Sequence, residues 1–296
     1  MTRRQAILAG AGGLLMAAQQ PASQLSVAGY IWQQYASRQK KALADVLDEI
    51  FAMARNAGFR SVELSDACFS PALRDRVLKL ARSSGLSMPS VYVGGAMHEA
   101  ALANETIARA LEIGELCKGL GCGAVVNNPN PLPQGAQKSD AELGIQAESL
   151  NRMGRALSAK GLQFRVHHHN PEMAANAREW RHILKNTDAN YVSLCPDLDW
   201  MYQGGMDPLV LLREAGARVT EVHVRNSKDK LWLESFGEGD LDYVEIAATV
   251  KKLRLPPLIV VELAYRNETA VTRPLEVDLR LSRTYAEKVF GIPAKS

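Results

Sequence analysis

Short runs of apolar residues alternate along the chain with longer segments in which apolar residues recur every three or four positions. Runs rich in valine, isoleucine and leucine and bounded by turn residues are typical of buried strands. On this pattern we predict eight strands, at residues 25–30, 61–64, 88–93, 124–127, 163–168, 191–195, 219–223 and 258–263.

The segments between the predicted strands have the spacing of amphipathic helices. The stretch "ALADVLDEIFAMARNAG" repeats leucine and isoleucine at helical spacing and stops at Gly58. The stretch "TIARALEIGELCKGLGCG" stops at a pair of glycines, and "AELGIQAESLNRMGRALSAKG" ends at Gly161. Glycine just past the last helical residue is a common helix terminator. We expect further helices after the sixth, seventh and eighth strands.

Eight strands alternating with eight helices predict an α/β fold, a single-domain (β/α)8 TIM barrel. An open doubly wound sheet would also alternate, but no G-x-G-x-x-G motif follows the first predicted strand. No linker, low-complexity tract or charge run divides residues 23–296. We therefore expect one barrel domain over that range.

Residues 1–22 have the pattern of a signal segment. Arg3 and Arg4 form a basic start, and the apolar stretch at 6–18 is shorter than the roughly 20 residues that a membrane span needs. Adjacent arginines before a weakly hydrophobic stretch resemble a twin-arginine signal. We therefore expect export to the periplasm and no stable membrane anchoring afterwards, although no clear cleavage site marks the boundary.

The composition, 47% hydrophobic and 23% charged residues, is that of an ordinary globular protein. The net charge is +3, and the signal segment contributes two arginines and no acidic residue, so the barrel itself is close to neutral. Such a balance gives nucleic acid no support as a partner. The four cysteines show no C-x-x-C spacing and lie in or beside apolar segments, so we expect buried free thiols and no cysteine-based zinc site.

Residues that bind metals follow several of the predicted strands. In a TIM barrel the carboxyl ends of the strands meet at a common site. The second, fifth, sixth, seventh and eighth strands carry or lead to Glu63, His167, His168, His169, Asp197, Asp199, His223 and Glu262.

Alternation along a strand places His167 and His169 on one side and His168 on the other. Two imidazoles and the carboxylates of Asp197 and Glu262, with His223, can then converge on one cation. A nitrogen and oxygen set without thiolate suits Mn²⁺, Fe²⁺, Co²⁺ or Zn²⁺ better than Ca²⁺ or Mg²⁺. Each residue also has a structural alternative, a hydrogen-bonded histidine or a helix cap. A structural role of this kind fits Glu262 least well. It follows four apolar residues, and burying an unpaired carboxylate there would carry a large desolvation free energy.

Five segments together resemble the xylose isomerase-like TIM barrel superfamily, which includes sugar phosphate isomerases and epimerases and an inosose dehydratase-like group. The resemblance extends over residues 25–290 and rests on "AGFRSVEL", "HHHNPE", "PDLDWMYQGGMDP", "HVRNSKDKLWLESFGEGDLDY" and "VVELAYRNET". It implies a divalent metal bound by His167, Asp197, His223 and Glu262. His169 matches the second histidine of the same family segment, so the choice between His167 and His169 as the ligand is open.

Two departures from the family bear on the reaction. Many of its epimerases and isomerases have a glutamate where this chain has His167, and they use paired glutamates on opposite faces of the sugar. The Lys-Asp of the seventh strand is replaced by Arg225 and Asn226. The sequence therefore leaves open an isomerase or epimerase on one side and a dehydratase or lyase on the other.

The resemblance implies chemistry next to the carbonyl of a keto-sugar, keto-glycoside or cyclitol, with the cation as Lewis acid. The acidic residues of "GEGD" and "AYRNET", after the seventh and eighth strands, oppose a phosphoryl group, so we expect an unphosphorylated substrate. Glu262 is the candidate base, His169 the candidate acid and Glu172 the reserve acid. The candidate substrate contacts are Glu63, Asn127, Trp200, Arg225, Trp232 and Arg266.

Two other functions compete with a sugar enzyme. One is a metal-dependent phosphodiesterase of the apurinic endonuclease type, which the near-neutral charge and the expected export disfavour. The other is a non-catalytic carbohydrate-binding barrel, which would bind metal without turnover. The sequence also leaves open which sugar and which metal are used and whether the chain forms a homo-oligomer.

Overall fold

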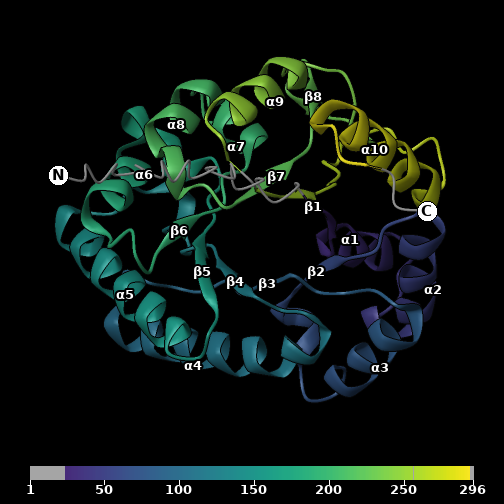
Figure 1. The fold of residues 1–296 in the computed structure, drawn as a ribbon, viewed down its shortest axis with the longest axis horizontal. Coiled ribbons are helices and arrows are strands. Elements are labelled where there is room, and N and C mark those ends of the chain that lie inside the picture. The colour runs from purple at the N-terminus through teal and green to yellow at the C-terminus, as the bar shows by residue number, and fades with distance from the viewer. Residues whose placement is uncertain (1–23, 256, 294–296) are drawn as a thin grey trace, which may run out of the picture.

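Eight parallel strands form an inner barrel in the computed structural model, which describes residues 24–255 and 257–293 (Figure 1). The predicted signal segment, residues 1–22, lies outside the described residues. The strands are β1 (Gln24–Ala28), β2 (Val62–Ser65), β3 (Ser90–Tyr92), β4 (Ala124–Asn127), β5 (Gln163–Val166), β6 (Ser193–Leu194), β7 (Glu221–Val224) and β10 (Leu258–Val261).

The strands are hydrogen-bonded in the order β6-β5-β4-β3-β2-β1-β10-β7. Bridges from Leu194 to Val219 and from Asp197 to His223 bring the two ends of this sheet together. The predicted (β/α)8 TIM barrel is confirmed.

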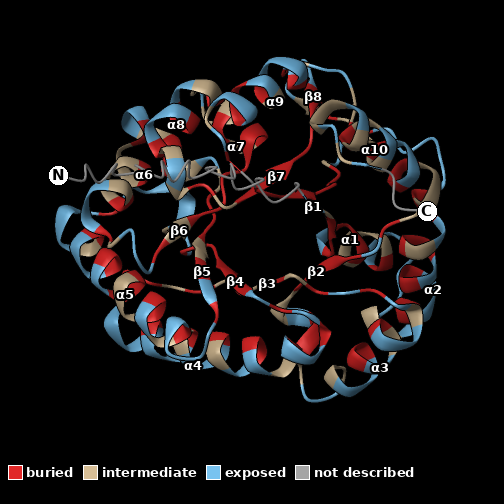
Figure 2. Cartoon of the chain, in the orientation of Figure 1, coloured by how far each residue is buried: buried red, intermediate tan, exposed pale blue. Residues whose placement is uncertain are grey.

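Helices surround the barrel and turn their apolar faces toward it (Figures 1 and 2). They are α1 (Tyr30–Arg38), α2 (Leu43–Asn56), α3 (Arg74–Ser84), α4 (Ala100–Cys117), α5 (Asp140–Ser158), α6 (Ala174–Asn186), α7 (Leu198–Gln203), α8 (Pro208–Ala215), α9 (Tyr243–Lys252) and α10 (Leu275–Phe290). Gly58 and Gly161, predicted to end helices, have φ of +93° and +70°, which glycine adopts without strain.

Two elements near the carboxyl ends of the strands were not predicted. The first strand ends at Ala28, earlier than expected, because α1 begins at Tyr30 and buries Ile31 and Trp32. After β7 the chain forms a two-stranded hairpin of β8 (Ser227–Lys228) and β9 (Leu231–Trp232).

Alternation along β7 separates an apolar side from a polar side. Val222 and Val224 belong to the main hydrophobic core, whereas Glu221 and His223 are buried next to each other. The polar side of this strand therefore faces the barrel interior, below the site at the carboxyl ends.

The four cysteines are buried free thiols, as predicted. In the described part of the chain no helix combines the length and the apolar character that a membrane span requires.

Candidate metal centre and active site

Four side chains converge at the carboxyl ends of neighbouring strands. His167, Asp197, His223 and Glu262 each offer one ligand atom, and these atoms all lie within 4.8 Å of one another. The residues follow β5, β6 and β10 or lie in β7, and all four are buried. His167 Nε2 lies 3.6 Å from Glu262 Oε2 and 3.9 Å from Asp197 Oδ2, and His223 Nδ1 lies 2.6 Å from Glu262 Oε2.

The ring of His167 fits a ligand role. It is fully buried, yet neither of its nitrogens has a hydrogen-bond partner among residues 24–255 and 257–293. Buried polar nitrogens are nearly always satisfied, and an exception calls for an explanation such as an ion. Two imidazoles and two carboxylates at this spacing suit a divalent transition metal. The residues present therefore fit the cation that the sequence implied.

Arg225 places a fixed positive charge beside two of these carboxylates. Its guanidinium is hydrogen-bonded to Asp197 and lies 3.9 Å from Glu262 Oε1. The same group lies over the rings of Trp200 and Trp232, 5.0 and 4.5 Å from their centroids. Burial between aromatic rings and carboxylates holds this side chain in one place.

The charges of the acidic groups differ within the site. Burial favours a higher pKa for Glu262, but Arg225 and His223 hold the pKa of this carboxyl well below its usual range, so it is ionised. Burial raises the pKa of Asp197 to about 7, against the effect of Arg225. Burial and the neighbouring Glu221 raise the pKa of Glu63 to about 8. Glu262 is therefore the strongly anionic member of the set.

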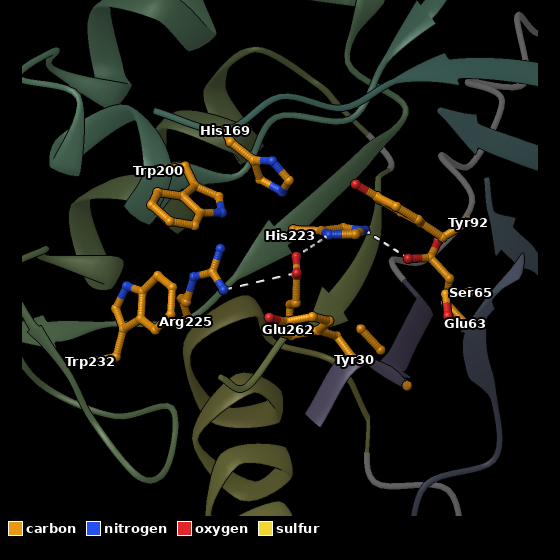
Figure 3. Close-up of a pocket in the computed structure, with 12 residues that line it drawn as sticks. Tyr30, Glu63, Ser65, Tyr92, His169, Trp200, His223, Arg225, Trp232 and Glu262 are labelled. Carbon is orange, nitrogen blue, oxygen red and sulfur yellow. Dashed lines mark hydrogen bonds and ion pairs between the residues drawn. The ribbon is translucent and has the colours of Figure 1, made fainter. Parts of the chain in front are cut away.

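A cavity of about 250 Å³ opens above the cluster (Figure 3). This volume lies below the range of about 300–1,000 Å³ that is typical of drug-sized ligands, so the cavity suits a molecule as small as a monosaccharide. Trp200, Trp232 and Arg225 lie on one side of it, Tyr92 and Glu63 on the other (Figure 3). His223 and Glu262 stand between the two sides.

The structure divides the predicted site residues into two groups. Glu63, His169, Trp200, His223, Arg225, Trp232 and Glu262 line the cavity. His167, Asp197, Asn127, Glu172 and Arg266 do not line it, so the cluster of four predicted ligands reaches the cavity through His223 and Glu262. Asn127 Nδ2 donates to Val93 O at 2.7 Å, and Arg266 lies over the ring of Trp232 at 4.6 Å from its centroid.

The three consecutive histidines have three different surroundings. His167 faces the ligand cluster, whereas the ring of His168 packs edge-on against Trp180 at a centroid distance of 4.9 Å. His168 Nε2 accepts a hydrogen bond from Asp197 N at 3.2 Å. His169 lines the cavity and contacts the ring of Trp200, 5.3 Å between centroids. The predicted alternation is followed although β5 already ends at Val166.

The pKa values of the two candidate acids differ. Burial lowers the pKa of His169 to about 4, so its ring is neutral at neutral pH. Burial and nearby Glu179 raise the pKa of Glu172 to about 7, but this side chain is buried outside the cavity and accepts a hydrogen bond from His169 N at 3.1 Å. The low pKa of His169 is unfavourable for the general-acid role that the sequence suggested.

The two tryptophans of the cavity differ in their N–H groups. Trp232 Nε1 donates to Asp199 Oδ2 at 2.7 Å, and two guanidinium groups already lie over its ring. Trp200 Nε1 is buried and has no hydrogen-bond partner in the described part of the chain. Figure 3 shows the indole nitrogen of Trp200 turned toward the space between His169 and Arg225. Trp200 is therefore a lining residue of the cavity whose N–H is left without a hydrogen bond among the described residues.

Tyr30, Ser65 and Tyr92 also line the cavity and were not predicted. Tyr92 contacts the ring of His167 edge-on, 5.4 Å between centroids. Tyr92 could have been predicted from the sequence, because it carries a hydroxyl near the carboxyl end of the third predicted strand. The predicted metal ligands were identified by the same kind of position at the ends of other strands. Tyr30 was assigned to a strand and Ser65 lay just beyond one.

The family model described as "Xylose isomerase-like TIM barrel" matches residues 51–285. The chain is 27% identical over 174 residues to an inosose dehydratase of Bacillus velezensis, an alignment that covers 53% of this chain and 57% of that protein. The chain thus spans little more than half the length of this curated relative.

Two solved structures share the fold. One is a sugar phosphate isomerase/epimerase of Parabacteroides distasonis, with a TM-score of 0.68 and 17% identity over 97% of this chain and 100% of the other. The second is a D-psicose 3-epimerase of Clostridium cellulolyticum crystallised with D-tagatose, with a TM-score of 0.70 and 15% identity over 90% and 99% of the two chains. Similarity at these identities concerns the barrel alone.

Proposed function

The chain belongs to the xylose isomerase-like TIM barrel family, and on that basis we propose that it is a divalent-metal-dependent lyase. Its substrate would be a keto-sugar, keto-glycoside or cyclitol, from which it eliminates water or an alcohol next to the carbonyl. The observation that carries this proposal is the convergence of His167, Asp197, His223 and Glu262, of which His223 and Glu262 line a cavity of monosaccharide size. The similarity to an inosose dehydratase supports the same reaction class.

The carboxylates of the cavity favour elimination over epimerisation. Two acidic residues line the cavity in the described part of the chain, Glu63 and Glu262. Glu63 accepts a hydrogen bond from Ser90 Oγ, and its Oε1 lies 3.0 Å from His223 Nε2. Its raised pKa disfavours the ionised carboxylate that a base needs. Epimerisation removes a proton on one face of the sugar and returns one on the other, which takes two such groups. Elimination requires only one base, and Glu262 supplies it.

A bound divalent cation would supply Lewis-acid polarisation of a carbonyl oxygen and a neighbouring hydroxyl oxygen. Glu262, ionised beside Arg225, takes the proton from the carbon next to the carbonyl. A carboxylate of low pKa is a weak base, so it depends on the acidity that the polarised carbonyl gives that C–H bond. A C=C bond forms as the C–O bond on the neighbouring carbon breaks.

The departing oxygen needs a proton and a place to be held. His169 is neutral and carries one N–H, which can donate a hydrogen bond to this oxygen at the cavity wall. The proton taken by Glu262 can be returned to the same oxygen, which then leaves as water or alcohol. One acidic group thus carries the proton from carbon to oxygen, and His169 positions the oxygen that receives it.

The proposed reaction is tested by a screen of purified protein supplied with Mn²⁺, Fe²⁺, Co²⁺ or Zn²⁺. Keto-cyclitols, keto-sugars and keto-glycosides are incubated with it, and products are followed by mass spectrometry and NMR. Loss of water or release of an aglycone is expected for at least one class. Epimerisation without elimination would refute the lyase assignment, and metal binding without turnover of any class would favour a carbohydrate-binding barrel.

Trp200→Phe is expected to raise the KM for the substrate found in that screen about fivefold, because one neutral hydrogen bond contributes about 1 kcal/mol. Phenylalanine keeps an aromatic ring and removes the unpartnered N–H. The matched variant is Trp232→Phe, whose lost N–H is bonded to Asp199. That change should lower the free energy of unfolding by about 1 kcal/mol and alter KM less. Equal effects of the two changes on KM would argue against Trp200 as a substrate donor.

We also propose that the protein is exported by the twin-arginine route, on the strength of Arg3 and Arg4 before the apolar stretch. Replacing both with lysine keeps the charge and removes the guanidinium pair that the export machinery reads. The double variant is expected to stay in the cytoplasm while the unchanged chain reaches the periplasm, as measured by cell fractionation. Normal accumulation of the variant in the periplasm would refute export by the twin-arginine route.

A further inference from the structure

We propose that a buried polar network inside the barrel orients His223 and thereby sets the affinity of the metal centre. The network consists of Glu63, Ser90, Arg165 and Glu221, which lie in β2, β3, β5 and β7 and are called the barrel network below. The inference rests on the proposed function in one respect, since it takes His223 to be a ligand of the cation.

The two nitrogens of His223 face opposite sides. Nε2 lies 3.0 Å from Glu63 Oε1 and 3.4 Å from Glu221 Oε1, on the side of the barrel network. Nδ1 lies 2.6 Å from Glu262 Oε2, on the side of the ligand cluster. With a cation bound among the four ligand side chains, Nδ1 would be the ligand atom of His223 and its proton would lie on Nε2, within reach of the oxygens of Glu63 and Glu221. Figure 3 shows the ring between Glu63 and Glu262.

The barrel network is itself tied together across four strands. Ser90 Oγ lies 2.6 Å from Glu63 Oε2 and 3.1 Å from Glu221 Oε1, so one hydroxyl joins both acidic groups. Arg165 forms an ion pair with Glu221, and its Nη2 donates to Gln163 Oε1 at 2.9 Å. The guanidinium of Arg165 thereby holds Glu221 in place. Within the barrel network, Glu63 makes the shortest contact with the ring, 3.0 Å from its Oε1 to His223 Nε2.

Stability alone does not account for such a network. Glu63, Ser90 and Glu221 are all at most 1% exposed. Buried charged groups are often replaced by apolar residues without loss of stability, because the cost of removing them from water offsets their attraction. A partner that fixes the orientation and tautomer of a metal-binding histidine does give these residues a function.

A second cation in the network is a rival interpretation, because Cys195, Glu221 and His223 also bring potential ligand atoms within 4.8 Å of one another. Glu221 of that set is already tied to Arg165 and Ser90, whereas the ring of His167 in the other set has no hydrogen-bond partner on either nitrogen among the described residues. The geometry therefore points to one cation, bound on the Nδ1 side of His223.

Metal titration of the purified full-length protein tests the inference without any substrate. Metal is removed with a chelator, and the Kd for Mn²⁺ and Co²⁺ is measured by calorimetry for the unchanged protein, Glu63→Leu and Glu63→Gln. Glu63→Leu is expected to weaken binding about 10- to 100-fold, the usual cost of losing a partner of a metal-binding histidine. Glu63→Gln restores an oxygen acceptor and should recover part of that affinity.

The matched control is Asp278→Asn, which alters a buried carboxylate of α10 that pairs with Arg273 and belongs neither to the ligand set nor to the cavity lining. It is expected to leave the Kd unchanged even where it lowers the melting temperature. Ser90→Ala keeps the size of the core nearly constant and should weaken binding in the same direction if Glu63→Leu fails to fold.

Unchanged Kd in both Glu63→Leu and Ser90→Ala would overturn the inference and leave the proposed function standing. A Kd weakened equally by Asp278→Asn would also overturn it, because the effect would then be one of general destabilisation. Two equivalents of metal per chain would favour the second-cation interpretation. If the unchanged protein bound no metal, both the inference and the proposed function would fail together.

Discussion

Replacing His167 with alanine is expected to weaken metal binding more than 100-fold, since loss of a direct ligand should exceed the roughly 10- to 100-fold cost of losing a partner of a ligand. Among the described residues, the ring of His167 has no hydrogen-bond partner on either nitrogen, whereas both nitrogens of His223 lie within hydrogen-bonding distance of a carboxylate. The bound metal per chain, measured by elemental analysis after dialysis, should fall close to zero.

His168→Ala is the matched control, because His168 is adjacent in the chain and equally buried but packs against Trp180. This change should keep the metal and reduce the free energy of unfolding by about 2 kcal/mol, through lost packing and a lost acceptor for Asp197 N. Equal metal content in the two variants would contradict the ligand set. Loss of metal in His169→Ala alone would make His169 the ligand instead.

Glu262→Gln is expected to reduce kcat by about 10²–10⁴-fold, the usual range for removing a general acid or base. Glutamine keeps the shape of the side chain and one oxygen atom. The affinity for the cation is therefore expected to fall, but the variant should still bind metal at saturating concentration. The substrate should also stop exchanging its hydrogen next to the carbonyl with deuterium oxide. These effects are measured together by steady-state kinetics and NMR at metal concentrations above the Kd of the variant.

The control for this change is Glu172→Gln, because Glu172 is also a buried acidic residue near the site but does not line the cavity. Its kcat should remain within about tenfold of that of the unchanged protein, below the range typical of an essential acid or base. Hydrogen exchange that persists in Glu262→Gln would place the base elsewhere. A large loss of kcat in Glu172→Gln would instead identify Glu172, the second candidate from the sequence, as the general acid.

The barrel was predictable because its strands are local features of the sequence. The run Leu258–Val261 is apolar throughout, as expected for a strand covered on both sides, and it is followed at once by Glu262. Carboxyl ends of parallel strands meet at one edge, so ligand-type residues there are predicted to converge even when far apart in the sequence. His167 and His223 are brought together in this way.

Partners inside the site were not predictable by the same reasoning. The spacing of residues does not indicate that Glu63 meets His223, because the contact spans the barrel interior and depends on which strands are opposite. The difference between Trp200 and Trp232 is likewise a matter of hydrogen-bond partners that only the folded chain defines. The low pKa of His169 follows from its burial, which a run of three polar histidines does not suggest.

The central claim, that one divalent cation held by these four side chains supports elimination, is tested most directly by restoring metal to the metal-free protein. Bound metal and elimination rate are measured in the same samples as Mn²⁺, Fe²⁺, Co²⁺ or Zn²⁺ is added. The account predicts that the rate rises in proportion to bound metal, reaches its maximum at one equivalent per chain, and does not recover in His167→Ala. Full elimination by metal-free protein, or a maximum unaffected by His167→Ala, would contradict it.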